Sequence, residues 1–270
     1  MRKITKFGIG IIVVVVVVAG LWMYHTHGLY ENTYSSEYGY RVTIETDSVL
    51  HNITLYLPLP VLEEKSKVGD EIIAGNASKP GEWVSKPDGW DCSIVKTEHG
   101  KMLKISAEKM APEFHSLPVP IELGEEPKEL PQGKVSDTFS KETPVLMPKE
   151  LSVEIHADHD VNTKNPIGNE PLLSPKHNLT RSTYELPYPE GRTPPNCYEY
   201  ESRIYADYTA SANTKVSIYI EAEGRNSWWV YGWSGNHYRD RIELTFTGEQ
   251  HGWYVASGKL IEGEGRYGWM

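Results

Sequence analysis

The sequence predicts an all-β fold: an antiparallel β-sandwich that forms an ectodomain behind one N-terminal transmembrane helix. Two observations lead to this prediction. A single apolar run without a charge lies near the N-terminus, and much of the remaining chain alternates apolar with polar residues at a period of two. No long stretch beyond the apolar run repeats at the 3.6-residue period of a helix, so a mainly helical domain is excluded.

The predicted transmembrane helix is the run Phe7 to Tyr24, which follows the basic residues Arg2, Lys3 and Lys6. Its 18 residues would form a helix about 27 Å long, close to the thickness of the hydrocarbon core of a bilayer. Because basic residues that flank a span stay on the cytoplasmic side, we expect the N-terminus in the cytoplasm and the rest of the chain outside.

The end of the apolar run leaves two interpretations open. A signal peptide would be cleaved after Ala19, since small residues and a basic N-terminal region fit the cleavage pattern. The run continues past that site to Tyr24, and the rings of Trp22 and Tyr24 suit the membrane interface. We therefore predict an uncleaved single-pass anchor: residues 1–24 form the cytoplasmic tip and the transmembrane helix, and residues 25–270 form an extracytoplasmic β domain at the cell membrane.

Alternating runs beyond the anchor predict the strands of the sandwich. Residues 41–45 and 53–57 alternate, and the short link from 47 to 52 between them predicts a β-hairpin. The clearest alternation lies in the C-terminal third, over residues 200–208, 216–222 and 242–246. Turn-forming residues separate these three runs, so we predict an antiparallel meander packed on a second layer.

A proline-rich segment interrupts the predicted strands. Seven prolines fall within residues 112–148, and proline has no N–H to donate to a sheet. The segment is therefore expected to leave the sheet. Two interpretations are open: a long excursion from one sandwich, which we favour, or a boundary between two domains.

The charge of the chain limits its partners. All 37 acidic residues lie beyond the anchor, together with 24 of the 27 basic residues, which gives this region a net charge of −13. Such an acidic region makes a nucleic acid or an anionic membrane surface a poor partner. The predicted partners are therefore the bilayer that holds the anchor, and an envelope glycan or protein.

Two cysteines and three glycosylation sequons lie in the predicted extracytoplasmic region. An oxidising compartment permits a disulfide between Cys92 and Cys197, and the alternative is a pair of buried free thiols. The sequons predict N-glycosylation at Asn52, Asn76 and Asn178.

One short string contains several metal-ligand residue types. On a strand, His156, Asp158 and Asp160 would project to one face, and imidazole with carboxylates suits zinc or a harder ion. No second cluster of this kind supplies the remaining ligands, and solvated polar residues at a strand end produce the same string. We therefore predict no bound metal and no cofactor.

The densest group of aromatic residues occupies residues 228–233. In an extended strand, Trp229, Tyr231 and Trp233 would share one face and form a flat platform of the kind that stacks on sugar rings or on a partner protein. Nearby polar residues, Asp240 among them, could bind hydroxyl groups. The alternative is that these rings belong to the core, where aromatic residues dominate the packing of β-sandwiches.

The sequence lacks the motifs of common enzymes. It has no G-x-S-x-G nucleophile elbow, no P-loop, no dinucleotide-binding loop, no H-E-x-x-H and no C-x-x-C. We predict a non-catalytic envelope-structural or interaction role. Two alternatives stay open: a lectin-like module that binds a glycan on the aromatic strand, and an extracytoplasmic hydrolase whose site is assembled from distant residues.

Three features carry a resemblance to a family: the basic and then valine-rich anchor, the segments Tyr40-Arg41-Val42-Thr43-Ile44 and Leu50-His51-Asn52-Ile53-Thr54-Leu55-Tyr56-Leu57-Pro58-Leu59-Pro60, and the C-terminal Gly252-Trp253-Tyr254. With these the chain resembles the uncharacterised membrane-anchored cell-surface proteins of archaea, especially methanogens. The resemblance implies a cell-surface location and carries no catalytic residues over to this chain.

Overall fold

The computed structural model describes residues 2–75, 81–118, 139–184 and 194–268. Its helices are α1 (Arg2–Thr33) and α2 (Lys67–Ala74). Its strands are β1 (Ser35–Thr46), β2 (Leu50–Val61), β3 (Trp83–Ser85), β4 (Asp91–Thr97), β5 (Gly100–Met110), β6 (Glu113–Pro118), β7 (Phe139–Met147), β8 (Lys149–His156), β9 (Leu172–Ser174), β10 (His177–Ser182), β11 (Asn196–Thr209), β12 (Lys215–Trp229), β13 (Trp233–Thr247) and β14 (Gln250–Gly265). The predicted class, antiparallel β behind one N-terminal apolar helix, is confirmed.

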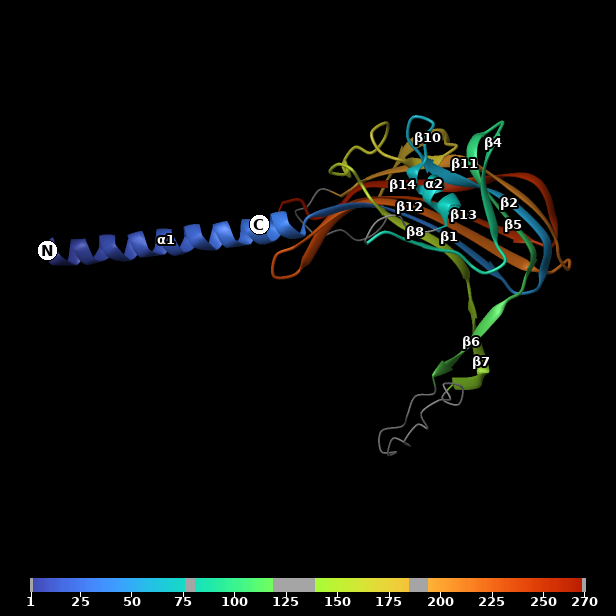
Figure 1. The fold of residues 1–270 in the computed structure, drawn as a ribbon, viewed down its shortest axis with the longest axis horizontal. Helices are drawn as coiled ribbons and strands as arrows, with labels where there is room; N and C mark the ends of the chain where they lie inside the picture. Colours follow the sequence, from blue (N-terminus) through green and yellow to red (C-terminus); the bar gives the residue numbers. More distant parts are fainter. Residues whose placement is uncertain (1, 76–80, 119–138, 185–193, 269–270) are drawn as a thin grey trace.

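Twelve strands form one sheet, which curls on itself (Figure 1). Ten follow the order β3-β8-β1-β12-β13-β14-β11-β2-β5-β4, with β9 paired to β2 and β10 paired to β11. The hydroxyl of Tyr40 on β1 crosses the interior and donates to the carbonyl of Pro58 on β2 at 2.8 Å. The two expected layers are therefore two parts of a single curled sheet. Its enclosed core includes Val42, Ile44, Leu55, Leu57, Ile105, Leu151, Ile204, Ile218, Ile220, Ile242 and Leu260.

The hairpin predicted at residues 47–52 is wrong. β1 pairs with β8 and β12, whereas β2 pairs with β5, β9 and β11. The carboxylate of Asp47 accepts a hydrogen bond from the backbone N–H of Lys215 at 3.0 Å, which ties the link to the start of β12. The chain therefore crosses from one side of the curled sheet to the other at this link instead of folding back in the plane.

The predicted C-terminal meander is confirmed for two of its three runs. Residues 216–222 and 242–246 lie on β12 and β13, which pair with each other, whereas residues 200–208 lie on β11, which pairs with β14 and β2. β12, β13 and β14 are consecutive in the chain and adjacent in the sheet. β11 lies on the far side of β14, paired with it from Asn196 to Tyr208, and does not contact β12 as a ladder partner. The alternating residues of these strands bury one face in the core and expose the other, as their period of two requires.

Helix α2 covers the opening between the two ends of the sheet. It contacts β8 near one end of the strand order and β4 at the other. Val68 and Ile72 on its inner side are buried in the core. The hydroxyl of Ser66 caps the first turn by accepting a hydrogen bond from the N–H of Gly69 at 3.0 Å, and Gly75 ends the helix in the left-handed conformation.

The proline-rich segment leaves the sheet as predicted. β6 and β7 pair only with each other and form a two-stranded ribbon that projects from the body of the protein (Figure 1). β5 before the ribbon and β8 after it belong to the same sheet, so the ribbon interrupts one sheet. Residues 119–138, at the centre of the segment, lie outside the described residues.

Helix α1 is longer than the apolar run. It continues past Tyr24 to Thr33, and its part Ile12–Thr33 is long and apolar enough to cross a membrane. The large apolar side chains from Ile12 to Leu21 are 55–65% exposed, so the sheet does not cover this part of the helix. Only the C-terminal turns of α1 reach the sheet, beside the end of β12.

Candidate functional site: aromatic clusters on the curled sheet

The aromatic string folds into a turn and not into one extended strand, so the strand predicted there is wrong. β12 ends at Trp229, β13 begins at Trp233, and the two residues face each other as cross-strand partners. Tyr231 lies in the turn between them with a left-handed backbone (φ 54°). Residues 229–233, called the hairpin tip from here on, therefore gather the three predicted rings through a hairpin.

The hairpin tip packs against helix α1. The ring of Tyr231 stacks on that of Trp22, with 5.2 Å between the ring centroids and 16° between the planes. The hydroxyl of Thr33 accepts a hydrogen bond from the N–H of Trp229 at 2.9 Å. Figure 1 shows this hairpin reaching back beside α1. A ring pair of this kind contributes about 0.5–1.5 kcal/mol beyond its buried area.

Burial divides the aromatic string into two parts. Trp228 is 2% exposed and lies between Tyr30 and Tyr34 of the α1 end, with ring centroids 5.5 Å and 6.1 Å away. Tyr231 is 53% exposed and Trp233 is 75% exposed. The core alternative therefore holds for Trp228, whereas Trp229 is half-buried and the rings of Tyr231 and Trp233 are exposed.

Two buried asparagines close the interior at the α1 end. The amide of Asn226 donates to the carbonyl of Val161 at 2.8 Å and to the side-chain oxygen of Asn236 at 2.9 Å. The side-chain oxygen of Asn226 accepts from the N–H of Val161 at 3.0 Å, and that of Asn236 accepts from the Thr163 hydroxyl at 2.6 Å. These bonds fix the loop 157–171 in the mouth of the curled sheet.

Asp240 lies inside the sheet and is 0% exposed, so the prediction that it flanks a surface platform is wrong. Its carboxylate accepts hydrogen bonds from the hydroxyl of Tyr200 at 2.5 Å and the N–H of Leu173 at 2.7 Å, and it forms an ion pair with Lys176. Burial raises the pKa of Tyr200, and the charge of Asp240 raises it further. Burial lowers the pKa of Lys176, whereas the charge of Asp240 and its hydrogen bond with Lys176 act to raise that pKa.

A second buried carboxylate, Glu170, is 2% exposed. It accepts hydrogen bonds from the hydroxyl of Tyr38 at 2.5 Å and the N–H of Asn162 at 2.6 Å, and His159 lies 3.3 Å away. Burial raises the pKa of Tyr38, and the hydrogen bond to Glu170 raises it further. Donors from the strands and from the loop thus occupy both buried carboxylates, which hold the segment 157–176 against the sheet.

A carboxylate near the end of β14 is also saturated. Glu264 accepts two hydrogen bonds from the guanidinium of Arg239, both at 2.8 Å, and one from the hydroxyl of Tyr184 at 3.1 Å. His237 lies 3.3 Å away. Burial alone would raise the pKa of Glu264, but the hydrogen bonds and charges of His237 and Arg239 lower it to about 2. Glu264 is therefore a charged structural group and not a proton donor at neutral pH.

The outer face of the sheet carries a row of aromatic residues that sequence patterns do not reveal. Tyr56 on β2 faces Tyr205 on β11, which faces Trp253 on β14. The two tyrosine rings stack at 4.8 Å, Trp253 meets Tyr205 edge-on at 5.3 Å, and His99 meets Trp253 at 4.6 Å. All four side chains are half-buried. We call these four residues the outer aromatic row.

The outer aromatic row lies away from α1. β13 begins at Trp233 beside α1 and runs to the opposite end of the sheet, where β14 begins at Gln250. Trp253 is near that start, so the row belongs to the half of the sheet distant from the helix. The three rings come from positions far apart in the sequence and pack into a compact cluster, because the centroids of Tyr56 and Trp253 are also only 5.9 Å apart. Their planes are inclined to one another, so they do not form the flat platform predicted for the string 228–233.

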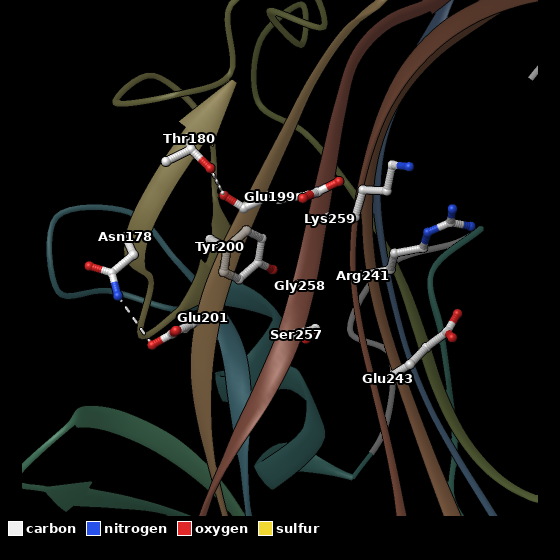
Figure 2. A pocket seen from close by; sticks show the side chains of 10 residues that line it. All are labelled: Asn178, Thr180, Glu199, Tyr200, Glu201, Arg241, Glu243, Ser257, Gly258 and Lys259. Carbon is white, nitrogen blue, oxygen red and sulfur yellow. Dashed lines mark hydrogen bonds between the residues drawn. The ribbon is translucent and has the colours of Figure 1, made fainter. Parts of the chain in front are cut away.

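A depression with a volume of about 670 Å³ lies on the outer face over β10, β11, β13 and β14 (Figure 2). Its lining is polar, and carboxylates from β11 (Glu199 and Glu201) and β13 (Glu243) lie on either side of Lys259 on β14. Arg241 adds a second positive charge. Opposite charges on neighbouring strands are the stabilising pattern of a solvated sheet face, so this depression does not favour the hydrolase alternative.

The three candidate metal ligands do not lie on one strand. β8 ends at His156, and Asp158 and Asp160 belong to the loop that follows. Asp158 forms an ion pair with Lys67 at the start of α2, and the imidazole Nδ1 of His156 lies 3.8 Å from a carboxylate oxygen of Glu37. Within the described residues, no three His, Cys, Asp or Glu side chains are grouped so that they could hold a metal ion.

Both cysteines are free thiols in the structure. Cys92 is on β4 and Cys197 on β11, and β2 and β5 lie between these strands in the sheet. Three strand spacings amount to about 14 Å, twice the Cα separation that a disulfide can bridge. The geometry therefore corresponds to the free-thiol alternative.

Two of the three sequons lie within the described residues. Asn52 on β2 and Asn178 on β10 are both exposed and have left-handed backbones. Asn76 lies outside the described residues. Glycosylation at these positions stays a prediction.

Comparison with protein families, with curated proteins and with solved structures found no match.

Proposed function

We propose that this protein is a single-pass membrane protein with an extracytoplasmic β domain, and that its role is envelope-structural or an interaction with other surface components. The observation that carries the proposal is the junction of α1 with the sheet. The helix runs from its apolar part to Thr33 without interruption and meets β1 at Ser35. Trp229 and Trp228 hold its last turns, so the helix and the sheet form one continuous structure.

The charges at the N-terminus support the orientation. Arg2, Lys3 and Lys6 precede the apolar run, and basic residues that flank a span favour the cytoplasmic side. The buried carboxylates support a non-catalytic role, because the hydrogen bonds that saturate Glu170 and Asp240 hold the segment 157–176 against the sheet.

Epitope tags at the two ends test the orientation. An antibody should bind a C-terminal tag on intact cells, and an N-terminal tag only after permeabilisation. The reverse pattern would contradict the proposed topology. Mass spectrometry of the purified protein separates the anchor from the signal peptide, because a mature chain beginning at Gly20 would establish cleavage.

A second candidate function, glycan binding, is favoured by the outer aromatic row. The centroids of its three strand-borne rings are 4.8–5.9 Å apart, and the rings lie on the half of the sheet distant from α1. The side chains of Asp207 on β11 and His251 on β14, with Oδ1 and Nδ1 2.6 Å apart, lie beside the row and offer polar groups for sugar hydroxyls. Stacking on aromatic rings together with a few such polar groups is a common way to bind carbohydrate.

A glycan array with the purified full chain tests this second candidate. The double variant Tyr205→Ala/Trp253→Ala should lose the glycan signal while it remains folded. The matched control Trp229→Ala/Trp233→Ala, at the hairpin tip, should retain the signal. Equal binding by wild type and the Tyr205/Trp253 variant would remove the row from consideration.

A further inference from the structure

The hairpin tip lies at the same level as the end of the apolar run of α1. Tyr231 stacks on Trp22 at 5.2 Å, and the ring of His25 lies 6.2 Å from that of Tyr231. Trp22 is two residues before Tyr24, the last residue of the run. A segment more than 200 residues away in the sequence is thus brought beside the point where α1 would leave the bilayer.

The hairpin tip itself contains no charged residue. No Asp, Glu, Lys or Arg occurs from Asn226 to Asn236. Trp233 is 75% exposed and Tyr231 is 53% exposed, although both are among the largest side chains in the protein. On α1, Tyr24 is 81% exposed. Exposed aromatic rings that converge from two elements without a charge between them mark an interaction surface.

We propose that the hairpin tip inserts into the interfacial layer of the outer leaflet and forms a second membrane contact beside α1. This inference rests on the proposed function, because it requires α1 to span the bilayer. The apolar run of about 27 Å matches the hydrocarbon core and places Trp22 and Tyr24 at the outer interface. Tyr231, stacked on Trp22, is then at the same depth, where tyrosine and tryptophan rings are preferred.

The backbone of the tip fits the interface and not the hydrocarbon core. The N–H of Val230 bonds within the turn to the carbonyl of Gly232 at 3.1 Å, and Thr33 satisfies the N–H of Trp229. Other polar groups of a turn need water, which the interface supplies and the hydrocarbon core does not. Because the tip carries no charge, its contact with lipid does not depend on the sign of the headgroup and is compatible with the acidic domain.

Site-specific fluorescence in vesicles tests the proposal on the full chain. A polarity-sensitive fluorophore is attached to single cysteines at three positions, in a Cys92→Ser/Cys197→Ser background reconstituted in phosphatidylcholine vesicles. Trp233→Cys reports on the tip. Thr247→Cys, exposed at the other end of the same strand, is the matched control. Leu21→Cys reports on the apolar run of α1. A lipid-attached quencher and aqueous iodide are compared at each position.

The inference predicts strong lipid quenching and weak iodide quenching at positions 21 and 233, with the opposite pattern at 247. Lipid quenching at 21 together with iodide quenching at 233 would overturn the inference and leave the membrane anchor standing. Iodide quenching at both 21 and 233 would overturn the proposed function as well. Unchanged melting curves of the labelled proteins exclude a misfolded hairpin as the cause.

An unlabelled variant checks that the native rings make the contact. In Tyr231→Ser/Trp233→Ser, the tryptophan emission quenched by lipid-attached bromine should fall relative to the wild type. A glycan-array signal that disappears in this variant, without any change in lipid quenching, would assign the tip to carbohydrate instead and overturn the inference.

Discussion

Replacing Asp240 by asparagine should destabilise the fold severely. Asp240 is 0% exposed and accepts hydrogen bonds from Tyr200 and Leu173 besides its ion pair with Lys176. The substitution Asp240→Asn removes the negative charge and leaves the ammonium group of Lys176, whose side chain is only 15% exposed, without its counter-ion. Breaking a buried pair in this way costs about 3–5 kcal/mol.

The measurement is urea unfolding of the full chain in mild detergent, followed by tryptophan emission, with the free energy of unfolding compared between variants. Asp207→Asn is the matched control. Its carboxylate pairs with His251, but the two side chains are 42% and 60% exposed, so the loss should stay within about 1 kcal/mol.

A double variant locates the cause. If the uncompensated ammonium group dominates, Lys176→Met added to Asp240→Asn should recover part of the lost stability, because an apolar side chain then occupies the same space. A loss below about 1 kcal/mol for Asp240→Asn alone would refute the reasoning, since it would show that the buried pair contributes no more than a surface pair.

Three further predictions concern packing, acid stability and the thiols. Gly258→Ala should cost about 1–3 kcal/mol in the same urea assay, because the added methyl group would clash with the ring of Tyr200, whereas Gly→Ala at an open site such as Gly20 should not. The pKa of Glu264 is depressed from 4.5 to about 2, so its stabilisation is complete above pH 4.5 and is lost as the pH falls towards 2. The difference in the free energy of unfolding between wild type and Glu264→Gln should therefore shrink by up to about 3 kcal/mol as the pH falls across that window. A difference that stays constant would contradict this prediction. Alkylation of the unfolded, unreduced protein should modify both Cys92 and Cys197, and a linked peptide pair would show that they are bridged.

The positions of the strands could be predicted because the signal is local. Along β12, Val216, Ile218 and Ile220 are buried while Lys215 and Ser217 are exposed, as alternation in the sequence requires. The pairing of strands could not be predicted in the same way. β1 and β2 look like a hairpin because they are close in the chain, but the partners that bury their faces come from distant segments.

The candidate site was predicted only in part for a similar reason. The aromatic string was visible, but its turn was not predicted. Tyr231 occupies the turn with a left-handed backbone, which residues other than glycine rarely adopt. The outer aromatic row combines Tyr56, Tyr205 and Trp253, which no local pattern connects. The sequence predicts Asp240 as a surface residue, because sequence alone does not show that its partners Lys176 and Tyr200 lie in the interior.

The curled sheet stops short of a closed barrel, and this has a consequence for contacts between copies of the protein. A free sheet edge presents unpaired backbone groups to which a strand of a neighbouring molecule can add. Here one edge strand, β3, is only three residues long, and α2 lies across the gap between the two ends. Neighbouring molecules therefore find no long template for strand addition along β3, and the domain can be packed densely without polymerising through that edge.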